Sequence, residues 1–317
     1  MKNQYVHELE PGQIVAEKFI LSKKIMKEKK DGGTYSMLEF ADRSGSIEGI
    51  AWDSMSEDIK KVSVGDFVFV TGNVNEYNER LQIVVNSICQ VPETEIDPVD
   101  FLPRTDEDID KVMAEIFEYK AKVVNPYLKN LLENFFKNED FVKNFRLAPA
   151  AKRAHHAYLG GLAVHTRNTL RLMNSMHPVY PFLNFDLLIT SAILHDIGKI
   201  YEYSYKTKID LSTRGKMLGH ICISYEMVTT EIDKIPQFPE DLKIKLLHMI
   251  VSHHGEFEWG SPKLPAFPEA LILHFIDNLD SKIDMMMNEL KKNRGTEKEW
   301  SDYHPFLERE IYLREEK

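Results

Sequence analysis

The stretch FDLLITSAILHDIGK, residues 185–199, decides how the second half of this chain folds. From Phe185 to Ile197 it is apolar nearly all round, which predicts a helix that is buried on every side. His195 and Asp196 lie at the end of this helix, inside the apolar pattern. Burying a carboxylate without a partner is unfavourable, and a metal ion would supply that partner. The stretch therefore predicts a helical domain built around a buried polar centre.

Other predicted helices add polar side chains on their inward faces. Apolar stripes with helical spacing recur at 185–197, 240–254 and 268–290. A lone histidine in such a stripe is more often a core residue than a ligand. An ordered set of buried titratable groups is different, because burying them without a metal would be strongly destabilising. Imidazoles and carboxylates that converge from separate helices predict a bundle-type metal site, formed by His165, His195, Asp196, His220, His253, His254 and Asp277.

The first 92 residues predict a β-barrel. A polar helical stretch, Ser54–Lys61, lies between the third and fourth of five strand-like runs. Turn-forming residues such as Asp31-Gly32-Gly33 separate the runs. Five strands with a helix between strands three and four is the order of an OB-fold, a small barrel that binds oligonucleotides. The runs are Ile14–Ile25, Tyr35–Phe40, Ile47–Trp52, Phe67–Val74 and Leu81–Val91.

A proline-containing segment separates the two predicted parts. Pro92, Pro98 and Pro103 interrupt regular structure between the last strand-like run and the first helical pattern. We therefore expect an OB-fold nucleic-acid-binding domain over residues 1–92 and a linker over 93–105. The helical region follows over 106–317, with the metal site within 160–285. The expected fold class is a five-stranded OB-fold barrel followed by an all-α helical bundle.

Composition limits the partners and the compartment. The chain of 317 residues has a formal net charge of −10. A nucleic-acid-binding protein usually presents a basic face, so this charge argues against nucleic-acid binding unless the lysines and arginines are concentrated in one place. Bound metal ions would also offset some of its carboxylates. No apolar run approaches the length of about 18 residues that a membrane span needs, so no membrane partner is expected. Cys89 and Cys222 lie in apolar patterns and are expected to be buried free thiols of a cytoplasmic protein.

The order of the predicted ligands resembles that of the HD-domain metal-dependent phosphohydrolases. His253-His254 matches the subset that binds two metals. In the first 92 residues, the pattern Leu38-x-Phe40-x-Asp42-x-x-Gly45-x-Ile47 resembles nucleic-acid-binding OB-folds. Four further motifs are Gly160-Gly161-Leu162-x-x-His165-Thr166, Gly219-His220-Ile221, His253-His254-Gly255-x-x-Glu258-Trp259-Gly260 and Asp277-Asn278-Leu279-Asp280. They resemble the YhaM-type exoribonucleases, a family that combines an OB-fold with an HD domain. One departure is Ala163-Val164, where that family has Leu-Glu.

The resemblance implies a metal-dependent 3′→5′ exonuclease that hydrolyses single-stranded RNA, and by extension single-stranded DNA, to nucleoside monophosphates. It implies that Asp196 bridges two divalent ions. One ion would be held by His165, His195 and Asp277, and the other by His220, His253 and His254. Nitrogen and oxygen ligands without thiolate suit Mn²⁺, with Fe²⁺ and Co²⁺ as other candidates.

Two such ions near 4 Å apart would activate a shared water and stabilise the charge on the phosphoryl oxygens. Asp196 is therefore expected to be catalytic. Lys199 lies one turn beyond His195 and would neutralise the developing charge. A lysine favoured by the helix dipole at a C-terminus is the competing explanation for Lys199.

Further residues are expected to bind substrate. Lys152, Arg153, His155 and His156 precede the first ligand and would contact phosphates, although basic residues are also ordinary on loop surfaces. Trp259 would stack on a base, with burial in the core as the alternative. A basic cluster lies near the first hairpin of the barrel. We favour the interpretation that it attracts single strands by its positive charge over the alternative that its lysines only contact solvent. The cluster comprises Lys23, Lys24, Lys27, Lys29 and Lys30, beside Tyr35.

Two other functions stay open at this point. An HD-domain phosphohydrolase acting on nucleotides or cyclic dinucleotides would use the OB-fold as a regulatory module. A single-strand-binding protein would have an inactive HD domain, against which the complete set of ligands argues. The expected partner is single-stranded RNA or DNA, and the sequence is compatible with a homo-oligomer.

Overall fold

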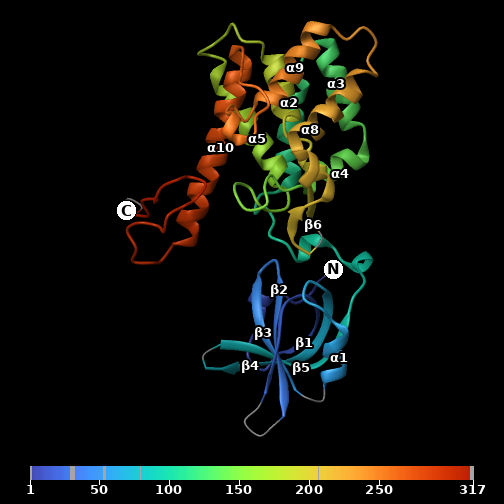
Figure 1. The fold of residues 1–317 in the computed structure, drawn as a ribbon, viewed down its shortest axis with the longest axis vertical. Coiled ribbons are helices and arrows are strands. Elements are labelled where there is room, and N and C mark those ends of the chain that lie inside the picture. The colour runs from blue at the N-terminus through green and yellow to red at the C-terminus, as the bar shows by residue number, and fades with distance from the viewer. Residues whose placement is uncertain (1, 29–32, 53–54, 79, 206, 315–317) are drawn as a thin grey trace. The chain divides into compact units, whose positions relative to one another are not determined.

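The computed structural model describes residues 2–28, 33–52, 55–78, 80–205 and 207–314 (Figure 1). The described residues do not include Lys29 and Lys30 of the predicted basic cluster. They also do not include Asp31 and Gly32 of the predicted turn, or Ser54 at the start of the predicted helix. The chain divides into two compact units. One contains residues 1–104 with 205–209, and the other contains residues 105–204 and 210–317.

The N-terminal unit is a closed five-stranded barrel, which confirms the predicted OB-fold. The strand order is β1-β2-β3-β5-β4, and all neighbouring pairs are antiparallel except the parallel pair β3 and β5. The predicted helix between the third and fourth strands is present as α1, Ser56–Lys61. The strands are β1 Ile14–Glu28, β2 Thr34–Asp42, β3 Gly45–Trp52, β4 Phe67–Tyr77 and β5 Arg80–Gln90.

Alternating burial explains why these residues form strands. In β2, Ser36, Leu38 and Phe40 are buried, while the residues between them are partly exposed. Gly49 lies opposite Leu38 on β3, and a Cβ atom at Gly49 would lie 2.4 Å from the Phe40 ring. The barrel therefore closes over large apolar side chains where a glycine leaves room for them.

The segment after the barrel packs against it. Residues 93–104 contain two short 3₁₀ turns, Glu93–Glu95 and Pro98–Asp100. Phe101 packs edge-on against Phe67, with ring centroids 5.0 Å apart. Asp100 accepts a hydrogen bond from the Tyr5 hydroxyl at 2.6 Å. Most of the segment expected as a linker thus belongs to the N-terminal unit, because it buries its own aromatic side chain there.

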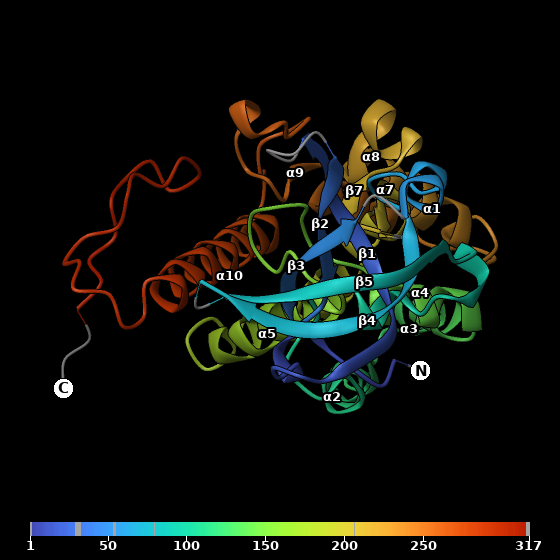
Figure 2. The ribbon, with the colours of Figure 1, turned by 90° about the horizontal axis from the view of Figure 1, so that it is seen from below.

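The C-terminal unit is a helical bundle, as predicted, and α6 is its central helix. Leu187–Leu194 are all buried, and α6 packs against α2, α3, α5, α9 and α10. Figure 2 shows the length of α10, after which the described residues 293–314 contain no further helix. The helices are α2 Ile109–Ala121, α3 Pro126–Phe136, α4 Glu139–Leu147, α5 Gly161–Met176, α6 Phe185–Leu194, α7 Lys199–Glu202, α8 Thr213–Ile232, α9 Glu240–Ser252 and α10 Pro268–Lys292.

Two details differ from the expectations. A short two-stranded sheet, β6 Tyr203–Tyr205 with β7 Ile209–Leu211, follows α7 in the otherwise helical region. Cys89 and Cys222 are free but exposed. Each cysteine is next to a buried isoleucine, so an apolar neighbourhood in sequence did not mean an inward position. No helix among the described residues is long and apolar enough to cross a membrane.

Candidate metal centre

The ends and inner faces of five helices bring together the seven side chains predicted as ligands. They form two adjoining groups, and within each group one ligand atom per residue lies within 4.8 Å of the others. His165 comes from α5 and Asp277 from α10, whereas the remaining residues lie at the end of α6, at a kink of α8 and at the end of α9. The groups are His165, His195, Asp196 and Asp277, and His220, His253 and His254.

Three of the five imidazoles are held by backbone carbonyls. The Nδ1 atom of His195 donates to the Ala192 carbonyl at 2.9 Å, and that of His253 donates to the Ile250 carbonyl at 2.7 Å. His254 Nδ1 donates to the Trp259 carbonyl at 2.8 Å. A carbonyl oxygen only accepts, so Nδ1 carries the proton in these rings and Nε2 keeps its lone pair.

The other two imidazoles are held by carboxylates. His165 Nδ1 lies 2.7 Å from Asp280 Oδ2, and His220 Nδ1 lies 3.1 Å from Glu202 Oε1. Metal-binding histidines commonly direct their second nitrogen to a carboxylate or carbonyl in this way, because it fixes the tautomer and the ring orientation. All five rings are thus oriented through Nδ1, which leaves Nε2 for a ligand.

Glycines allow the close approach that places His220. Gly219 has φ +70°, a left-handed conformation that breaks α8 into two helical segments just before His220. The His220 N–H then donates to Glu202 Oε1 at 3.0 Å. A Cβ atom at Gly198 would lie 2.2 Å from the His220 carbonyl oxygen, so α7 and α8 approach this closely only because residue 198 is glycine.

Asp196 faces both groups. Its Oδ2 lies 3.4 Å from His195 Nε2 and 3.7 Å from His165 Nε2. Its Oδ1 lies 3.4 Å from His220 Nε2 and 3.5 Å from His253 Nε2. One carboxylate therefore presents one oxygen to each cluster.

Buried polar atoms in both groups lack the partners that burial requires. The Nε2 atoms of His195 and His253 and Oδ1 of Asp196 are buried without a hydrogen-bond partner among the residues that the structure describes. Each unsatisfied buried atom costs about 1–3 kcal/mol. Imidazole nitrogens and carboxylate oxygens form a donor set that divalent transition metals accept, so these residues fit a metal site.

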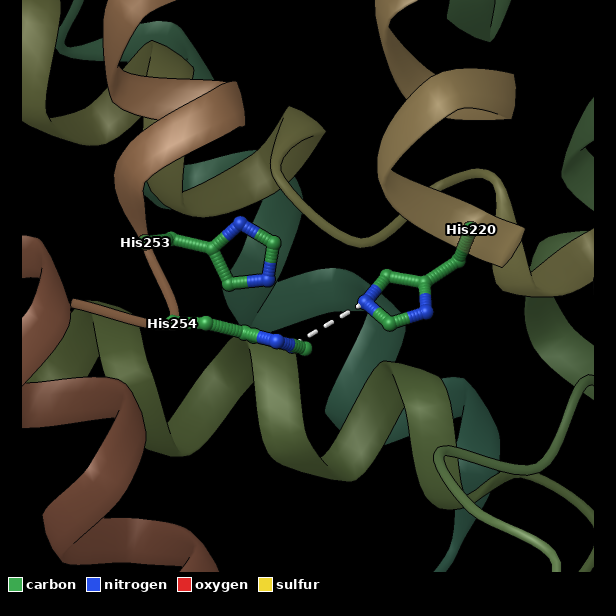
Figure 3. A group of neighbouring side chains, drawn as sticks. All are labelled: His220, His253 and His254. Carbon is green, nitrogen blue, oxygen red and sulfur yellow. Dashed lines mark hydrogen bonds between the residues drawn. The ribbon is translucent and has the colours of Figure 1, made fainter. Parts of the chain in front are cut away.

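Figure 3 shows the second group, in which His220 and His254 point their Nε2 atoms at each other. These two nitrogens are 3.2 Å apart. Burial, with smaller contributions from His253 and His220, lowers the pKa of His254 to about 3. His254 is therefore neutral near pH 7, and a cation between the two rings would satisfy both nitrogens.

The first group already attracts a positive charge. Burial lowers the pKa of His165, but hydrogen bonds to Asp277 and Asp280 outweigh it and raise this pKa to about 10. Asp277 Oδ1 lies 3.1 Å from His165 Nε2. The carboxylates that stabilise a proton on His165 would equally stabilise a metal cation at the same nitrogen.

The substrate-binding residues predicted before α5 have different surroundings. Lys152 pairs with Asp210, with 2.5 Å between Nζ and Oδ1, and Arg153 is exposed. His155 lies beside His165, with ring centroids 5.5 Å apart. His156 is only 3% exposed, and both of its ring nitrogens are bonded. Lys152 and His156 are therefore already engaged by other residues, whereas Arg153 and His155 are placed to contact a ligand.

Trp259 lies next to the second group through its backbone. Its carbonyl accepts the hydrogen bond from His254, while the residue as a whole is 47% exposed and so is not part of the core. The Lys282 ammonium lies 5.3 Å from the centre of the indole ring. Lys282 was not expected from the sequence, because its contact with Trp259 depends on how α10 packs beside the segment that holds Trp259.

The carboxylates that orient the histidines provide a test of the site. Replacing Glu202 by Gln should lower the affinity for Mn²⁺ roughly tenfold, because a neutral amide is a weaker acceptor for His220 Nδ1. The matched control is Glu226→Gln on α8, where Glu226 is exposed and pairs with Arg214. Calorimetric Mn²⁺ titration measures both affinities. Equal affinities in the two variants would mean that Glu202 does not support the site.

Comparison with known proteins supports this description. An HD-domain family model matches residues 162–282, and an OB-fold nucleic-acid-binding-domain model matches residues 19–89. The fold and the site thus define a two-domain protein that joins an OB-fold to an HD domain, a domain of metal-dependent phosphohydrolases.

Curated relatives identify the family. The 3′-5′ exoribonuclease YhaM of Geobacillus sp. (strain WCH70) is 35% identical, over 83% of this chain and 80% of that protein. The YhaM protein of Bacillus subtilis (strain 168) is also 35% identical, over 83% of both chains. That of Bacillus velezensis is 33% identical, over 92% of this chain and 91% of that protein. The chain belongs to the YhaM 3′-5′ exoribonuclease family.

Proposed function

We propose that this protein is a metal-dependent 3′→5′ exoribonuclease that shortens single-stranded RNA and releases nucleoside monophosphates. The observation that supports it most strongly is the pair of adjoining ligand groups in the HD domain of a chain of this family. Single-stranded DNA is proposed as a second substrate. The free thiols of Cys89 and Cys222 suit the reducing cytoplasm, which is the proposed compartment.

We propose two divalent ions, with Mn²⁺ as the first candidate. His165, His195 and Asp277 would hold one ion, and His220, His253 and His254 the other, in line with the two groups of ligand atoms. Asp196 would bridge them, which is supported by the position of its two oxygens, one near His195 and the other near His220. The chemistry that such ions supply when bound is activation of water and stabilisation of charge on the phosphoryl oxygens.

Lys199 supplies a fixed positive charge beside the centre. Its Nζ lies 2.6 Å from Asp196 Oδ2, and the side chain is buried. Lys199 therefore holds Asp196 in place and balances part of the carboxylate charge in the cluster. We propose that the same ammonium stabilises the negative charge that develops on the phosphoryl group during hydrolysis.

We propose that the outer face of the barrel binds the single strand. Lys27, Tyr35 and Trp52 lie opposite one another on β1, β2 and β3 and so form one row on one face. The rings of Tyr35 and Trp52 are 6.0 Å apart, and Trp52 is 45% exposed. A lysine beside an exposed tryptophan and a half-buried tyrosine suits a base that stacks and a phosphate that pairs with the lysine. Trp52 was not predicted as a binding residue.

The lysines of β1 allow a matched test of this face. Lys27 is exposed, whereas the Lys24 ammonium donates to the carbonyls of Ile59 at 2.6 Å and Val62 at 2.7 Å, at the end of α1. Lys27→Ala should weaken RNA binding and reduce the salt dependence by the equivalent of about one phosphate contact. Lys24→Ala should instead lower the free energy of unfolding by about 1–3 kcal/mol. Fluorescence titrations at several salt concentrations and urea unfolding measure the two effects.

The activity itself is tested with 5′-labelled single-stranded RNA and Mn²⁺. We expect a ladder of labelled products that shortens progressively from the 3′ end, together with nucleoside monophosphates. A 3′-terminal phosphorothioate block should slow the reaction, and a 5′ block should not. The same reaction with DNA and with cyclic dinucleotides establishes the substrate range. If the protein hydrolysed cyclic dinucleotides and left RNA intact, the proposed function would be wrong. The alternative, a nucleotide phosphohydrolase, would take its place.

A further inference from the structure

Two adjacent histidines before α5, His155 and His156, lie in contrasting surroundings. Both ring nitrogens of His156 are engaged, Nε2 at 2.8 Å from Asp280 Oδ2 and Nδ1 at 2.8 Å from the Tyr158 hydroxyl. The backbone N–H of His156 donates to Asp284 Oδ2 at 2.7 Å. His156 thus has no ring nitrogen left for a ligand.

Asp280 links His156 to the metal centre. Its Oδ2 lies 2.8 Å from His156 Nε2 and 2.7 Å from His165 Nδ1, and its Oδ1 accepts from the Asn168 amide at 2.9 Å. The side chains therefore form a continuous chain from His156 through Asp280 to His165. The position of Asp280, and with it the direction of His165 Nε2, depends on the His156 ring.

The backbone holds His156 in this position. Its φ is +46°, a left-handed conformation that is uncommon for a residue other than glycine. The first turn of α5 packs directly on it, because a Cβ atom at Gly161 would lie only 2.1 Å from the His156 carbonyl oxygen. A strained conformation enforced by close packing is frequent at functional sites.

His155 has the opposite character. Its Nε2 atom is buried, and no described residue offers it a hydrogen-bond partner. The ring lies beside His165, with centroids 5.5 Å apart, yet His155 belongs to neither group of ligand atoms. A buried polar nitrogen next to the metal centre, and outside the ligand set, is placed to bind what the centre acts on.

We propose that the two histidines have separate roles. His155 donates a hydrogen bond from Nε2 to a phosphoryl oxygen of the bound RNA, whereas His156 is a positioning residue that acts through Asp280 on His165. The inference rests on the proposed function, since it takes RNA as the substrate. It distinguishes two residues that the sequence placed together as phosphate contacts.

The test replaces each histidine by asparagine, which is better tolerated than most residues at a left-handed φ. His155→Asn should keep the Mn²⁺ affinity within twofold and lower kcat/KM for single-stranded RNA roughly 10- to 100-fold, because one hydrogen bond to a charged group is lost. His156→Asn should lower the Mn²⁺ affinity roughly 10- to 100-fold. Saturating Mn²⁺ should restore most of its kcat.

Two further variants sharpen the comparison. Tyr158→Phe removes the hydroxyl from His156 Nδ1 and should lower the Mn²⁺ affinity less than His156→Asn does. His177→Asn, at the exposed C-terminus of α5, should change neither quantity. Circular dichroism and thermal melting show whether each variant is folded.

The division of roles is overturned if His155→Asn loses Mn²⁺ affinity as His156→Asn does, or if it retains kcat/KM for RNA. It is equally overturned if His156→Asn binds Mn²⁺ normally. The Mn²⁺ titrations require no substrate, so they test the role of His156 even if the wild-type protein leaves RNA intact. That last result would contradict the proposed function itself.

Discussion

Replacing Asp196 by Asn should abolish the hydrolysis of RNA, with kcat lowered roughly a thousandfold or more. The amide keeps the size of the side chain but removes the charge that faces both groups of ligands. Its NH₂ group would also point a donor at histidine nitrogens that lie 3.4–3.7 Å from the present oxygens. Single-turnover assays at saturating Mn²⁺ measure the rate, and elemental analysis of dialysed protein measures the metal content.

The control for this variant is Asp233→Asn at the end of α8. Asp233 pairs with Lys243 at 2.7 Å on the exposed side of the unit and should be replaceable without loss of activity. The bridging role of Asp196 would be refuted by an Asp196→Asn protein that is folded, retains its full metal content and hydrolyses RNA within tenfold of the wild-type rate.

Removing the metal should destabilise the helical unit and leave the barrel unchanged. A ligand present at 100 times its Kd stabilises a protein by about 2.7 kcal/mol. For a unit of roughly 200 residues this corresponds to a rise in Tm of about 5–11 °C, at roughly 2–4 °C for each kcal/mol. The physical reason is the set of buried nitrogens and oxygens that lack partners without an ion.

Hydrogen exchange measured with Mn²⁺ and with a chelator resolves the two units. We expect chelation to reduce protection in α5, α6 and α10, whereas the strands of the barrel should exchange at the same rate. In Asp196→Asn the effect of Mn²⁺ on Tm should largely disappear. Equal loss of protection in β1–β5 would show that metal binding and barrel stability are coupled, contrary to this expectation.

The positions of the central helix and of the clustered side chains could be predicted from the sequence because one physical rule governs them. A helix that is apolar on all sides must be buried, so His195 and Asp196 at the end of α6 had to be internal. His165 and Asp277 follow from the apolar stripes of their own helices. The structure brings the seven side chains together, and their role as metal ligands stays a prediction.

The residues that orient the ligands could not be predicted in the same way. Asp280 lies one helical turn after Asp277, which places it on the same face of α10, but its partner His165 is 115 residues away. Glu202 is a buried acid whose role depends on the kink at Gly219. Such pairings depend on how helices pack, which helical periodicity does not encode.

Strand alternation would have separated the lysines of β1. Lys23 and Lys27 lie on the face of Tyr35, whereas Lys24 lies on the other face, opposite Leu38. Sequence proximity alone grouped the three lysines together. The contact that decides the role of Lys24, with the end of α1, joins residues 35 and 38 positions apart in the chain.

The hydrogen bonds from histidine Nδ1 atoms to backbone carbonyls have a consequence for how the centre selects its ion. His195 and His253 are held by carbonyls only three residues earlier in their own chain segments, so their orientation is set by local folding. Rings that are already oriented need little rearrangement when an ion arrives or leaves. The relative affinities of divalent metal ions for such a preorganised site, rich in nitrogen ligands, follow the Irving–Williams order. The resident metal is then determined by which divalent ions the cell keeps available, and one ion can replace another without refolding the protein.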